Sequence, residues 1–397
     1  MSILSSRKMA MLTHALVSSS RLVRASASSP LAASRLASSA SAAATTTTDA
    51  GGAQGQQAAR SIRWGICGTG TIASDMVQVL RQLPGTEVRA VGSRSAEGAA
   101  KFADKWCPVG PSGGPVARCA SYEELAARDD LDVVYVATPS ARHVDDCLLY
   151  LNSGKAVLCE KSMAPDREGA QKVLDAARAN NLFFLHGVWS RFFPAMGALR
   201  EQIRSGAIGE VTSAHASFCQ NDGAGSCSAT LETGIYAAQF LDWVFDCGAP
   251  KQVASVAYDL HPNGNDQHAA AVLQFSNGGM GTLECSLRHP SPREATVCGT
   301  KGVIRVPFPF WCPTKFTVQS MSGLGSQTWG EEQTFDFPLP QDVQGKFNFV
   351  NSEGLAYEAL EVNRCLRAGL TESPAFDDAA CLAVMDVITR IRAHWKK

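Results

Sequence analysis

The chain has 397 residues, with 36 basic and 37 acidic side chains, and 45% of its residues are hydrophobic. This length leaves room for two domains with cores of their own, and the composition is that of an ordinary globular protein. No apolar run is long enough to cross a membrane, so we expect no transmembrane helix. The thirteen cysteines contain no C-x-x-C pair, which argues against a zinc ribbon and favours reduced, buried thiols; we expect no bound metal.

Residues 1–60 differ in composition from the rest of the chain. They are dominated by Ser, Ala and Thr, and they contain several arginines but a single acid, Asp49. This arginine-rich, acid-poor pattern is typical of an organelle transit peptide, so we expect residues 1–60 to be a disordered import signal. Arg21, Arg24 and Arg35 are interspersed with leucine and valine, which favours a mitochondrion over a plastid. The alternative is a leader without function on a cytoplasmic protein.

Without this leader the chain has 30 basic and 36 acidic side chains. A mildly acidic globular protein gives no reason to expect a nucleic acid or an anionic membrane surface as a partner. The motifs in the remaining sequence indicate a small-molecule ligand instead.

A glycine-rich turn opens the expected folded part. A short strand from Arg63 leads into Gly68-Thr69-Gly70-Thr71-Ile72-Ala73, and residues 74–83 follow with helical spacing. In a G-x-G-x-x-A turn the first glycine makes the bend and the second lets the backbone approach a pyrophosphate. The small third residue packs the helix against the strand. The pattern predicts a dinucleotide site with contacts at Gly68, Gly70, Thr71 and Ile72.

The end of the next expected strand indicates which dinucleotide binds. Glu87 to Gly92 is followed by Ser93 and Arg94, where an NAD-preferring site usually has an acid for the ribose hydroxyl. A guanidinium beside hydroxyl groups suits a 2′-phosphate, so we expect NADP rather than NAD. Alternatively, Arg94 is a solvated side chain that simply follows the strand.

Two further apolar strands end in polar residues. Residues 131–137 lead to Thr138, Pro139 and His143, and residues 155–159 lead to Glu160 and Lys161. Strands and helices alternate through residue 186, which predicts a doubly wound parallel sheet over 61–186. Ligands bind outside the carboxyl ends of such strands, so Lys161 is a candidate cation beside a reacting oxygen. A surface lysine after an ordinary strand is the alternative.

From about residue 208 the pattern changes to alternating apolar and polar residues. Four such segments predict strands of an antiparallel sheet: 211–218, 252–258, 269–275 and 280–287. Asn277-Gly278 between the last two is a hairpin signal. One helix is expected at 231–245 and another at 377–395. The chain therefore divides into a nucleotide-binding α/β domain, 61–186, and a second α+β domain, 187–397.

Several short motifs make the chain similar to one known family. They are Gly154–Lys161, Trp189–Pro194, Gly234–Tyr236, Gly299–Gly302, Trp311–Thr314 and Glu372–Pro374. From Arg63 to its end the chain resembles the glucose-fructose oxidoreductase / inositol dehydrogenase / MocA-like family. Its motifs are most similar to those of dimeric dihydrodiol dehydrogenases and NADP-dependent D-xylose dehydrogenases. The resemblance implies a Rossmann domain joined to a domain with an open, mainly antiparallel sheet.

The resemblance also implies a catalytic lysine and a catalytic tyrosine. Lys161 matches the lysine of the family's E-K-P motif, and Tyr236 matches a tyrosine on a helix of the second domain. An adjacent ammonium favours the phenolate, so Lys161 is expected to lower the pKa of Tyr236 or to hold the substrate hydroxyl itself. Taken alone, Tyr236 is more consistent with a core aromatic residue on an amphipathic helix, and the matching family motif reverses this interpretation. The cofactor is expected at Gly68, Gly70, Thr71, Ile72, Ser93, Arg94, Thr138, Pro139, His143, Glu160, Lys161, Trp189 and Arg191, and the substrate at Lys161, Trp189, Glu232 and Tyr236.

Four features depart from the family pattern. Ser162 replaces the proline of E-K-P, and Glu232 stands where the family has an aspartate four residues before the tyrosine. The loop 222–229 is short and lacks the expected glycine pair and nearby arginine, which leaves the identity of the substrate open. His186 stands where relatives carry an acid, and a buried, hydrogen-bonded histidine is as well supported as a pocket residue.

Together these features predict an NADP-dependent oxidoreductase that moves a hydride from a cyclic polyol to NADP. The substrate is either a D-xylose-type aldopyranose, oxidised to a lactone, or a trans-dihydrodiol, oxidised to a catechol. The alternative is a catalytically idle NADP-binding sensor or scaffold with the same fold. The resemblance further implies a homodimer formed through the open face of the second sheet, with Phe310–Pro313 near the contact.

Overall fold

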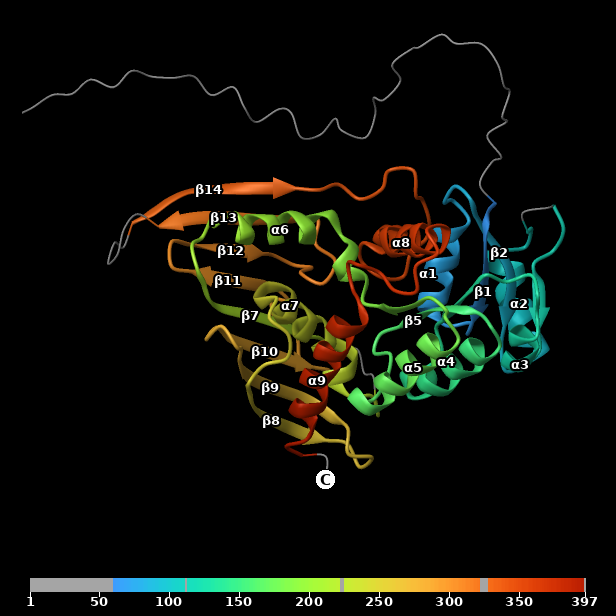
Figure 1. The fold of residues 1–397 in the computed structure, drawn as a ribbon, viewed down its shortest axis with the longest axis horizontal. Coiled ribbons are helices and arrows are strands. Elements are labelled where there is room, and N and C mark those ends of the chain that lie inside the picture. The colour runs from blue at the N-terminus through green and yellow to red at the C-terminus, as the bar shows by residue number, and fades with distance from the viewer. Residues whose placement is uncertain (1–59, 111–112, 222–224, 322–327, 396–397) are drawn as a thin grey trace, which may run out of the picture. The chain divides into compact units, whose positions relative to one another are not determined.

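The computed structural model describes residues 60–110, 113–221, 225–321 and 328–395, which form two β-sheets with helices packed against both (Figure 1). Both sheets belong to a single compact unit. The expected import signal lies outside the described residues, apart from Arg60 at its end. None of the described helices has the length and hydropathy needed to cross a bilayer.

The first sheet has six parallel strands in the order β3-β2-β1-β4-β5-β6. The strands are β1 (Ile62–Cys67), β2 (Thr86–Gly92), β3 (Ala117–Cys119), β4 (Val133–Val136), β5 (Ala156–Glu160) and β6 (Phe184–Gly187). The two central strands β4 and β5 are apolar and buried along their whole length, as expected for strands that are covered on both faces. This strand order is that of a Rossmann fold and confirms the predicted doubly wound sheet.

Helices cover both faces of this first sheet. They are α1 (Thr71–Leu80), α2 (Ala96–Trp106), α3 (Tyr122–Ala126), α4 (His143–Asn152) and α5 (Arg167–Ala179). α1 packs beside α2, whereas α4 packs against α3 and α5, so the helices form two layers. Ser95, Ser121 and Asp166 start α2, α3 and α5 by accepting a hydrogen bond from the backbone N–H three residues on.

The second sheet has eight strands in the order β14-β13-β12-β11-β7-β10-β9-β8. The strands are β7 (Val211–Cys219), β8 (Gln252–Leu260), β9 (Asp266–Gln274), β10 (Met280–Ser286), β11 (Ala295–Gly299), β12 (Gly302–Val306), β13 (Lys315–Met321) and β14 (Trp329–Asp336). Neighbouring strands are antiparallel except for β7 and β10, which run parallel. The predicted Asn277-Gly278 turn joins β9 to β10, with Gly278 at a φ of +88°. The mainly antiparallel sheet is therefore confirmed.

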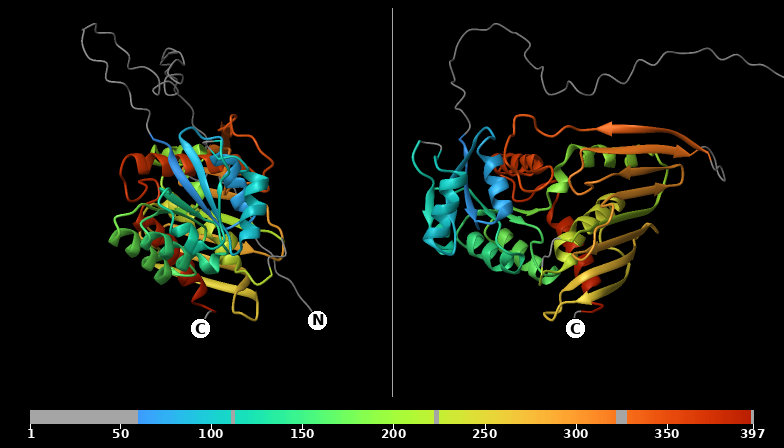
Figure 2. Two further views of the ribbon diagram at one scale, coloured as in Figure 1. Left: turned by 90° about the vertical axis from the view of Figure 1, so that its right-hand side faces the viewer. Right: turned by 180° about the vertical axis from the view of Figure 1, so that it is seen from behind.

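Helices cover one face of the second sheet. α7 (Ile235–Phe245), which continues a π-helical turn over Thr230–Gly234, packs on β7 and β10, and α9 (Asp378–Arg392) packs on β8. A further helix, α6 (Pro194–Arg204), lies beside β13. The other face carries no helix from the described part of the chain, as the rear view in Figure 2 shows.

One helix of the C-terminal part returns to the first sheet. α8 (Leu355–Arg367) packs beside α1 (Figure 1), and its Asn363 accepts a hydrogen bond from Trp64 Nε1 of β1 at 3.1 Å. The sequence pattern did not predict α8, because its inward face mixes apolar residues with the buried polar side chains of Glu358 and Asn363. The nucleotide-binding half therefore includes residues from the C-terminal part of the chain.

Candidate active site

Lys161 and Glu232 meet between the two sheets. Lys161 follows β5, whereas Glu232 lies in the π-helical turn before α7. Lys161 Nζ donates hydrogen bonds to Glu232 Oε2 at 2.9 Å and to the Glu232 carbonyl oxygen at 3.2 Å. Tyr236 is buried one turn further on, and its ring centroid lies 5.8 Å from Lys161 Nζ. The fold thus brings together three of the four residues to which the sequence assigned substrate contacts, and the fourth, Trp189, lines the same cavity.

Buried polar contacts fix the backbone next to Lys161. Ser162 Oγ donates to the Leu231 carbonyl oxygen at 2.9 Å and so links the end of β5 to the turn that carries Glu232. The Ser162 carbonyl oxygen lies 2.8 Å from His143 Nδ1, and the other ring nitrogen of His143 faces the Thr138 carbonyl oxygen at 2.7 Å. A proline at position 162 would lack the hydroxyl. Serine therefore adds a hydrogen bond across the boundary between the two sheets.

Electrostatics favour an ionised pair between Lys161 and Glu232. Burial acts to lower the pKa of Lys161, but Glu232 and Tyr236 outweigh it, so the net pKa is raised. Burial acts to raise the pKa of Glu232, but Lys161 outweighs it, so the net pKa is lowered. Both side chains are therefore charged at neutral pH.

Tyr236 differs from the sequence prediction in its ionisation. Burial raises the pKa of Tyr236 above its ordinary value, Lys161 opposes this increase, and Glu160 adds to it. The effect of Lys161 has the predicted sign, but burial is stronger because almost no surface of the phenol is exposed. Tyr236 is accordingly a neutral phenol at neutral pH, suited to donating a proton rather than to acting as a phenolate base.

A second carboxyl group, that of Glu160, lies next to Lys161. It accepts hydrogen bonds from the Tyr135 hydroxyl and from the backbone N–H of Lys161. Burial raises the pKa of Glu160, although Tyr135 and Lys161 oppose the increase. Glu358 of α8 is also fully buried, and burial followed by the charge of Glu160 raises its pKa well above the ordinary value. The charge of Glu160 helps to keep the proton on Lys161.

A cavity of about 670 Å³ opens at these residues, a volume typical of small-molecule sites. Its polar wall comes from the Rossmann half: Thr71, Ile72, Thr138, Pro139, Ser140, His143, Glu160 and Lys161. Its opposite side is rich in aromatic rings: Trp189, Phe218, Tyr236, Phe308, Trp311 and Phe349. A ligand in this cavity would therefore have the nucleotide turn on one side and an apolar surface on the other.

The glycine-rich turn has the shape that a dinucleotide phosphate needs. Gly68 has a φ of +104°, and a Cβ there would lie 2.6 Å from the Ala137 carbonyl oxygen, so only glycine fits. A Cβ at Gly70 would meet nothing within 4 Å, which leaves the backbone open to a ligand. No side chain caps α1 and no acid lies in its first turn, so its N-terminal N–H groups and dipole can attract an anion.

Ser93 and Arg94 follow β2 directly. Ser93 is buried, and its backbone N–H donates to the Cys119 carbonyl oxygen, whereas Arg94 is exposed. The nearby hydroxyl of Ser95 starts α2 by accepting a hydrogen bond from the Gly98 N–H. Arg94 is thus an exposed cation at the strand end where the sequence predicted a 2′-phosphate contact.

Two residues considered for the ligand site are buried away from the cavity. The Arg191 guanidinium binds the Asp242 carboxylate at 2.5 Å and lies over the Phe376 ring, and Arg191 does not line the cavity. In the structure Arg191, predicted as a cofactor contact, forms an ion pair with Asp242 of α7, which no local motif indicates. His186 is a core residue: its Nε2 accepts a hydrogen bond from the Met163 N–H at 3.2 Å, and burial lowers its pKa to about 3.

Four residues of the aromatic wall were not predicted as site residues: Phe218, Phe308, Trp311 and Phe349. Phe218 stacks on Tyr236 and on Trp311, with ring centroids 5.6 and 4.0 Å apart. Trp311, which was expected near a dimer contact, lines the cavity. The loop 222–229 lacks the expected arginine, but Arg293 brings a guanidinium to the cavity from the segment before β11. The pairing of β11 with β7 produces this contact, and no local sequence signal marks it.

Comparison with known proteins identifies both halves of the chain. The model of an oxidoreductase family with an NAD-binding Rossmann fold, GFO_IDH_MocA, matches residues 62–187, and the GFO/IDH/MocA C-terminal domain matches residues 196–305. The trans-1,2-dihydrobenzene-1,2-diol dehydrogenase of Bos taurus is 35% identical over 342 residues, covering 84% of this chain and 96% of the relative. The Homo sapiens protein of that name is 34% identical over 343 residues, with the same coverage.

Solved structures share the fold at lower identity. KijD10, a 3-ketoreductase from Actinomadura kijaniata in complex with TDP-benzene and NADP, has a TM-score of 0.68 at 22% identity and covers 84% of this chain and 97% of its own. Levoglucosan dehydrogenase in complex with NADH and levoglucosan has a TM-score of 0.70 at 18% identity, with coverages of 85% and 98%. The two family models and the curated relatives show that the chain belongs to the GFO/IDH/MocA family of oxidoreductases with an NAD(P)-binding Rossmann fold.

Proposed function

We propose that this protein is an NADP-dependent dehydrogenase of ring alcohols, with a trans-dihydrodiol as the first candidate substrate and a D-xylose-type aldopyranose as the second. The observation that carries this proposal is the ionised pair of Lys161 and Glu232 beside Tyr236, in the cavity next to the glycine-rich turn. Interconversion of an alcohol and a carbonyl group needs a cation at the oxygen and a group that exchanges its proton.

Lys161 is the residue that holds the substrate oxygen. Its ammonium group follows a buried strand and is oriented by Glu232, so a positive charge is already in place where negative charge develops. Tyr236 is a neutral phenol and can protonate that oxygen in the reductive direction. In the oxidative direction a base must take up the proton, and the ionised carboxylate of Glu232 is available for this role. NADP, held at Gly68, Gly70 and Thr71, supplies the hydride acceptor.

The preference for NADP rests on the end of β2. Ser93 and Arg94 occupy the place where a carboxylate would hold the ribose of NAD, and the guanidinium suits a 2′-phosphate. Arg94→Ala is expected to lower kcat/KM for NADP about 10- to 100-fold, the loss of a charge-assisted hydrogen bond, and to leave kcat/KM for NAD unchanged. An equal loss with both cofactors would contradict the assignment.

The aromatic wall favours a dihydrodiol over a sugar. Phe218, Phe308 and Trp311 offer flat apolar surfaces to a six-membered carbon ring, and the curated relatives are named as dehydrogenases of such a diol. The decisive experiment gives the full chain NADP with a panel of trans-dihydrodiols, pentoses and hexoses, and follows the absorbance of the reduced nicotinamide. The proposal is supported if a trans-dihydrodiol has the highest kcat/KM of all the substrates in the panel. If xylose has the highest kcat/KM, the second candidate is the substrate.

A catalytically idle cofactor sensor is the alternative from another class. Two features motivate it. The ammonium group of Lys161 is already paired with Glu232 and so is not free for a substrate oxygen, and the loop 222–229 departs from the family pattern. The sensor predicts that NADP quenches tryptophan fluorescence while no member of the panel is turned over. Sustained turnover of any substrate would exclude it.

We also propose that residues 1–60 direct the protein into a mitochondrion, because their arginine-rich, acid-poor composition is typical of import signals. Residues 1–60 fused to a fluorescent protein are expected to give a mitochondrial pattern. Fluorescence in plastids would show that the signal directs the protein into a plastid instead. Diffuse cytoplasmic fluorescence would refute import. The same fusion with Arg21, Arg24 and Arg35 changed to Ala is the matched control.

A further inference from the structure

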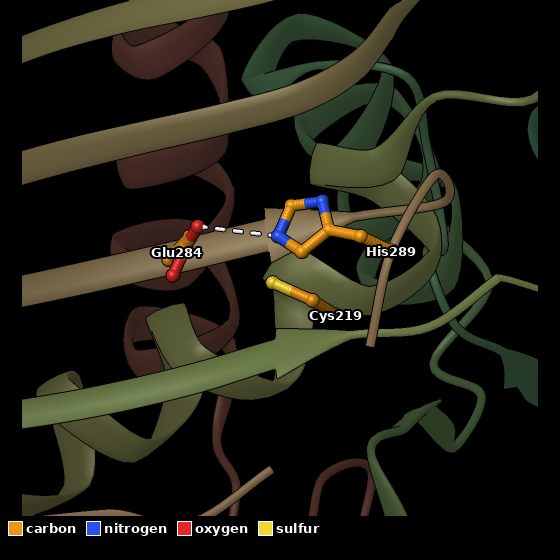
Figure 3. Close-up of side chains that lie close together, drawn as sticks. All are labelled: Cys219, Glu284 and His289. Carbon is orange, nitrogen blue, oxygen red and sulfur yellow. Dashed lines mark ion pairs between the residues drawn. The ribbon is translucent and has the colours of Figure 1, made fainter. Parts of the chain in front are cut away.

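Cys219, Glu284 and His289 converge on the second sheet, outside the proposed active site. Figure 3 shows their side chains pointing toward one another, from the end of β7, from β10 and from the segment after β10. One sulfur, oxygen or nitrogen atom from each lies within 4.8 Å of the others. His289 Nε2 lies 3.5 Å from Glu284 Oε1.

A second imidazole completes the cluster. His268 Nε2, on the neighbouring strand β9, lies 2.9 Å from the same Glu284 Oε1. The rings of His268 and His289 meet edge to face, with their centroids 4.7 Å apart. His268 therefore lies beside the group formed by Cys219, Glu284 and His289, and it contacts that group through Glu284 and the ring of His289.

The pairing of β7 with β10 places Cys219 and Glu284 on one face of the second sheet. Ser217 pairs with Glu284 and Cys219 with Ser286 across β7 and β10, so Cys219 and Glu284 lie on the same face of the sheet. Phe218 and Cys285 alternate with them and point to the side covered by α7. The cluster is thus on the face that carries no helix from the described residues.

The fold also orients the ligand atoms. The Ser286 hydroxyl lies 3.0 Å from His289 Nδ1 and accepts a hydrogen bond from the Arg288 N–H, so it fixes both the ring and its loop. Nδ1 is thereby occupied, and Nε2 is left to face Glu284 and Cys219. A hydroxyl that engages one ring nitrogen while the other faces the ligand is the arrangement found around metal-bound histidines. Cys219 is fully buried and cannot turn away into solvent.

From these contacts we propose that Cys219, Glu284, His289 and His268 bind a divalent zinc ion. A set of sulfur, nitrogen and carboxylate oxygen atoms is the one that zinc prefers over magnesium or calcium, which select oxygen ligands. Tetrahedral zinc with bonds of about 2.0–2.3 Å needs ligand atoms closer together than the 4.8 Å within which those of Cys219, Glu284 and His289 lie, so binding would draw these three side chains together and bring in His268 as the fourth ligand. Four protein ligands make a closed site, which implies a structural rather than a catalytic ion.

The ion would join three parts of the second sheet. It would hold the ends of β7, β9 and β10 together with the segment that carries His289. Gln220, which follows Cys219, lines the substrate cavity, so the site lies beside the cavity without entering it. Zinc is therefore expected to raise the thermal stability of the protein and to leave the hydride chemistry unchanged.

The test uses the full chain without an affinity tag, because histidine tags bind zinc themselves. The reduced protein is stripped with a chelator, titrated with zinc chloride against a fluorescent zinc indicator, and its metal content is measured by mass spectrometry after desalting. One zinc ion per chain and a higher midpoint of thermal unfolding are expected. Cobalt(II) should give a near-ultraviolet thiolate-to-cobalt absorption band.

Variants decide whether the site is the one described. Cys219→Ser should abolish the cobalt band, and Glu284→Gln, which keeps the shape of the side chain, should weaken zinc binding by more than the roughly 10- to 100-fold expected for Ser286→Ala. Cys298→Ser, a change in the same sheet away from the cluster, should bind zinc as the unsubstituted chain does. The proposal is overturned if the chain retains no zinc, or if Cys219→Ser and Glu284→Gln both retain it. In either case the four groups form only a hydrogen-bonded cluster.

Discussion

Lys161 carries a charge that is set by residues from both halves of the molecule. Glu160 precedes it in the first sheet and accepts a hydrogen bond from its backbone N–H, whereas Glu232, in the turn before α7, accepts a hydrogen bond from its ammonium group. Burial alone would favour the neutral amine, and the two acids reverse that preference. Such a cation keeps its charge throughout a catalytic cycle near neutral pH, so it acts as a fixed electrostatic group and not as the exchangeable acid.

Replacement of Lys161 by Met removes this charge and keeps the length of the side chain. Turnover is expected to fall roughly 10²–10⁴-fold, while the affinity for NADP changes little, because the glycine-rich turn does not depend on Lys161. Stopped-flow turnover and fluorescence titration with NADP measure the two quantities. Lys172→Met, at an exposed lysine of α5, is the matched control. Near-normal turnover in Lys161→Met would remove Lys161 from the mechanism.

His186 gives the folded state a definite pH dependence. Burial, followed by the charges of His143, Arg191 and Lys161, lowers the pKa of His186 from 6.5 to about 3. The folded chain therefore keeps this ring neutral, whereas the unfolded chain protonates it below about pH 6.5. The resulting contribution to stability is complete above pH 6.5 and is lost progressively as the pH falls toward 3.

His186→Gln removes the titration but retains an acceptor for the Met163 N–H. As the pH falls from 6 to 4, the free energy of unfolding should decrease in both proteins, but less steeply in the variant. The two slopes should differ by up to roughly 1.4 kcal/mol per pH unit, the value for one proton. Urea titrations at several pH values measure this slope. The exposed His215→Gln is the control and should keep the slope of the unsubstituted chain. Identical slopes in all three proteins would show that His186 is protonated in the folded state.

At the scale of elements, α1 does more than present its N-terminus to a phosphate. Asp75 on its inner side is fully buried and accepts hydrogen bonds from the N–H groups of Asn348 and Phe349 and from the Ser352 hydroxyl, at 3.0, 3.2 and 2.7 Å. Asn348 and Phe349 also line the cavity. One carboxylate thus connects the nucleotide-binding helix to a wall of the substrate site.

Asp75→Ala leaves these donors without their acceptor, so the free energy of unfolding should decrease by about 2–4 kcal/mol. The KM for the substrate should rise more than kcat falls, because the cavity wall loses its anchor while Lys161 is untouched. Thermal unfolding and steady-state kinetics separate the two effects. Asp129→Ala, at an exposed aspartate of the same half, should change neither. A variant with unchanged stability would show that the segment 348–352 is held by other contacts.

The elements with regular patterns could be predicted, and those determined by distant partners could not. The strand before Gly68 and the segments of β7 to β10 carry clear periodicity, and they formed as expected. Helix α8 was missed because Glu358 and Asn363 interrupt its apolar face, and the ion pair of Arg191 could not be predicted because its partner, Asp242, is 51 residues away. Ser162 could be recognised as a departure from the family motif, but its bond to Leu231 becomes evident only when both sheets are present.

At the scale of the whole molecule, the open face of the second sheet should be covered by a second copy of the chain. Val256 and Tyr258 on β8 are 71% and 75% exposed, and Val272 and Met280 extend this apolar surface across β9 and β10. Side chains of this size rarely remain open to water over several adjacent strands. We propose that a second copy of the chain covers this face in a homodimer.

The double change Val256→Asp and Tyr258→Asp places two charges on that surface, and it is expected to give a monomer under conditions in which the unsubstituted chain forms the proposed dimer. Sedimentation velocity at micromolar concentration measures the mass in solution. Val109→Asp, at a valine that is 54% exposed in the nucleotide-binding half, should remain dimeric. A dimer that survives the double change would have to use another surface.

The return of α8 to α1 has a consequence for how the gene can be divided. Asn363 joins Trp64 of β1 to Thr86 of β2, and Arg367 binds the Gly85 carbonyl oxygen, so the cofactor half is completed by residues encoded near the 3′ end. A fragment that stops at residue 187 would expose the surface of α1 that α8 covers. The strands of the second sheet therefore lie, in the chain, between the nucleotide-binding strands and the helix α8 that covers α1, so removal of the C-terminal part would also remove contacts of the first sheet.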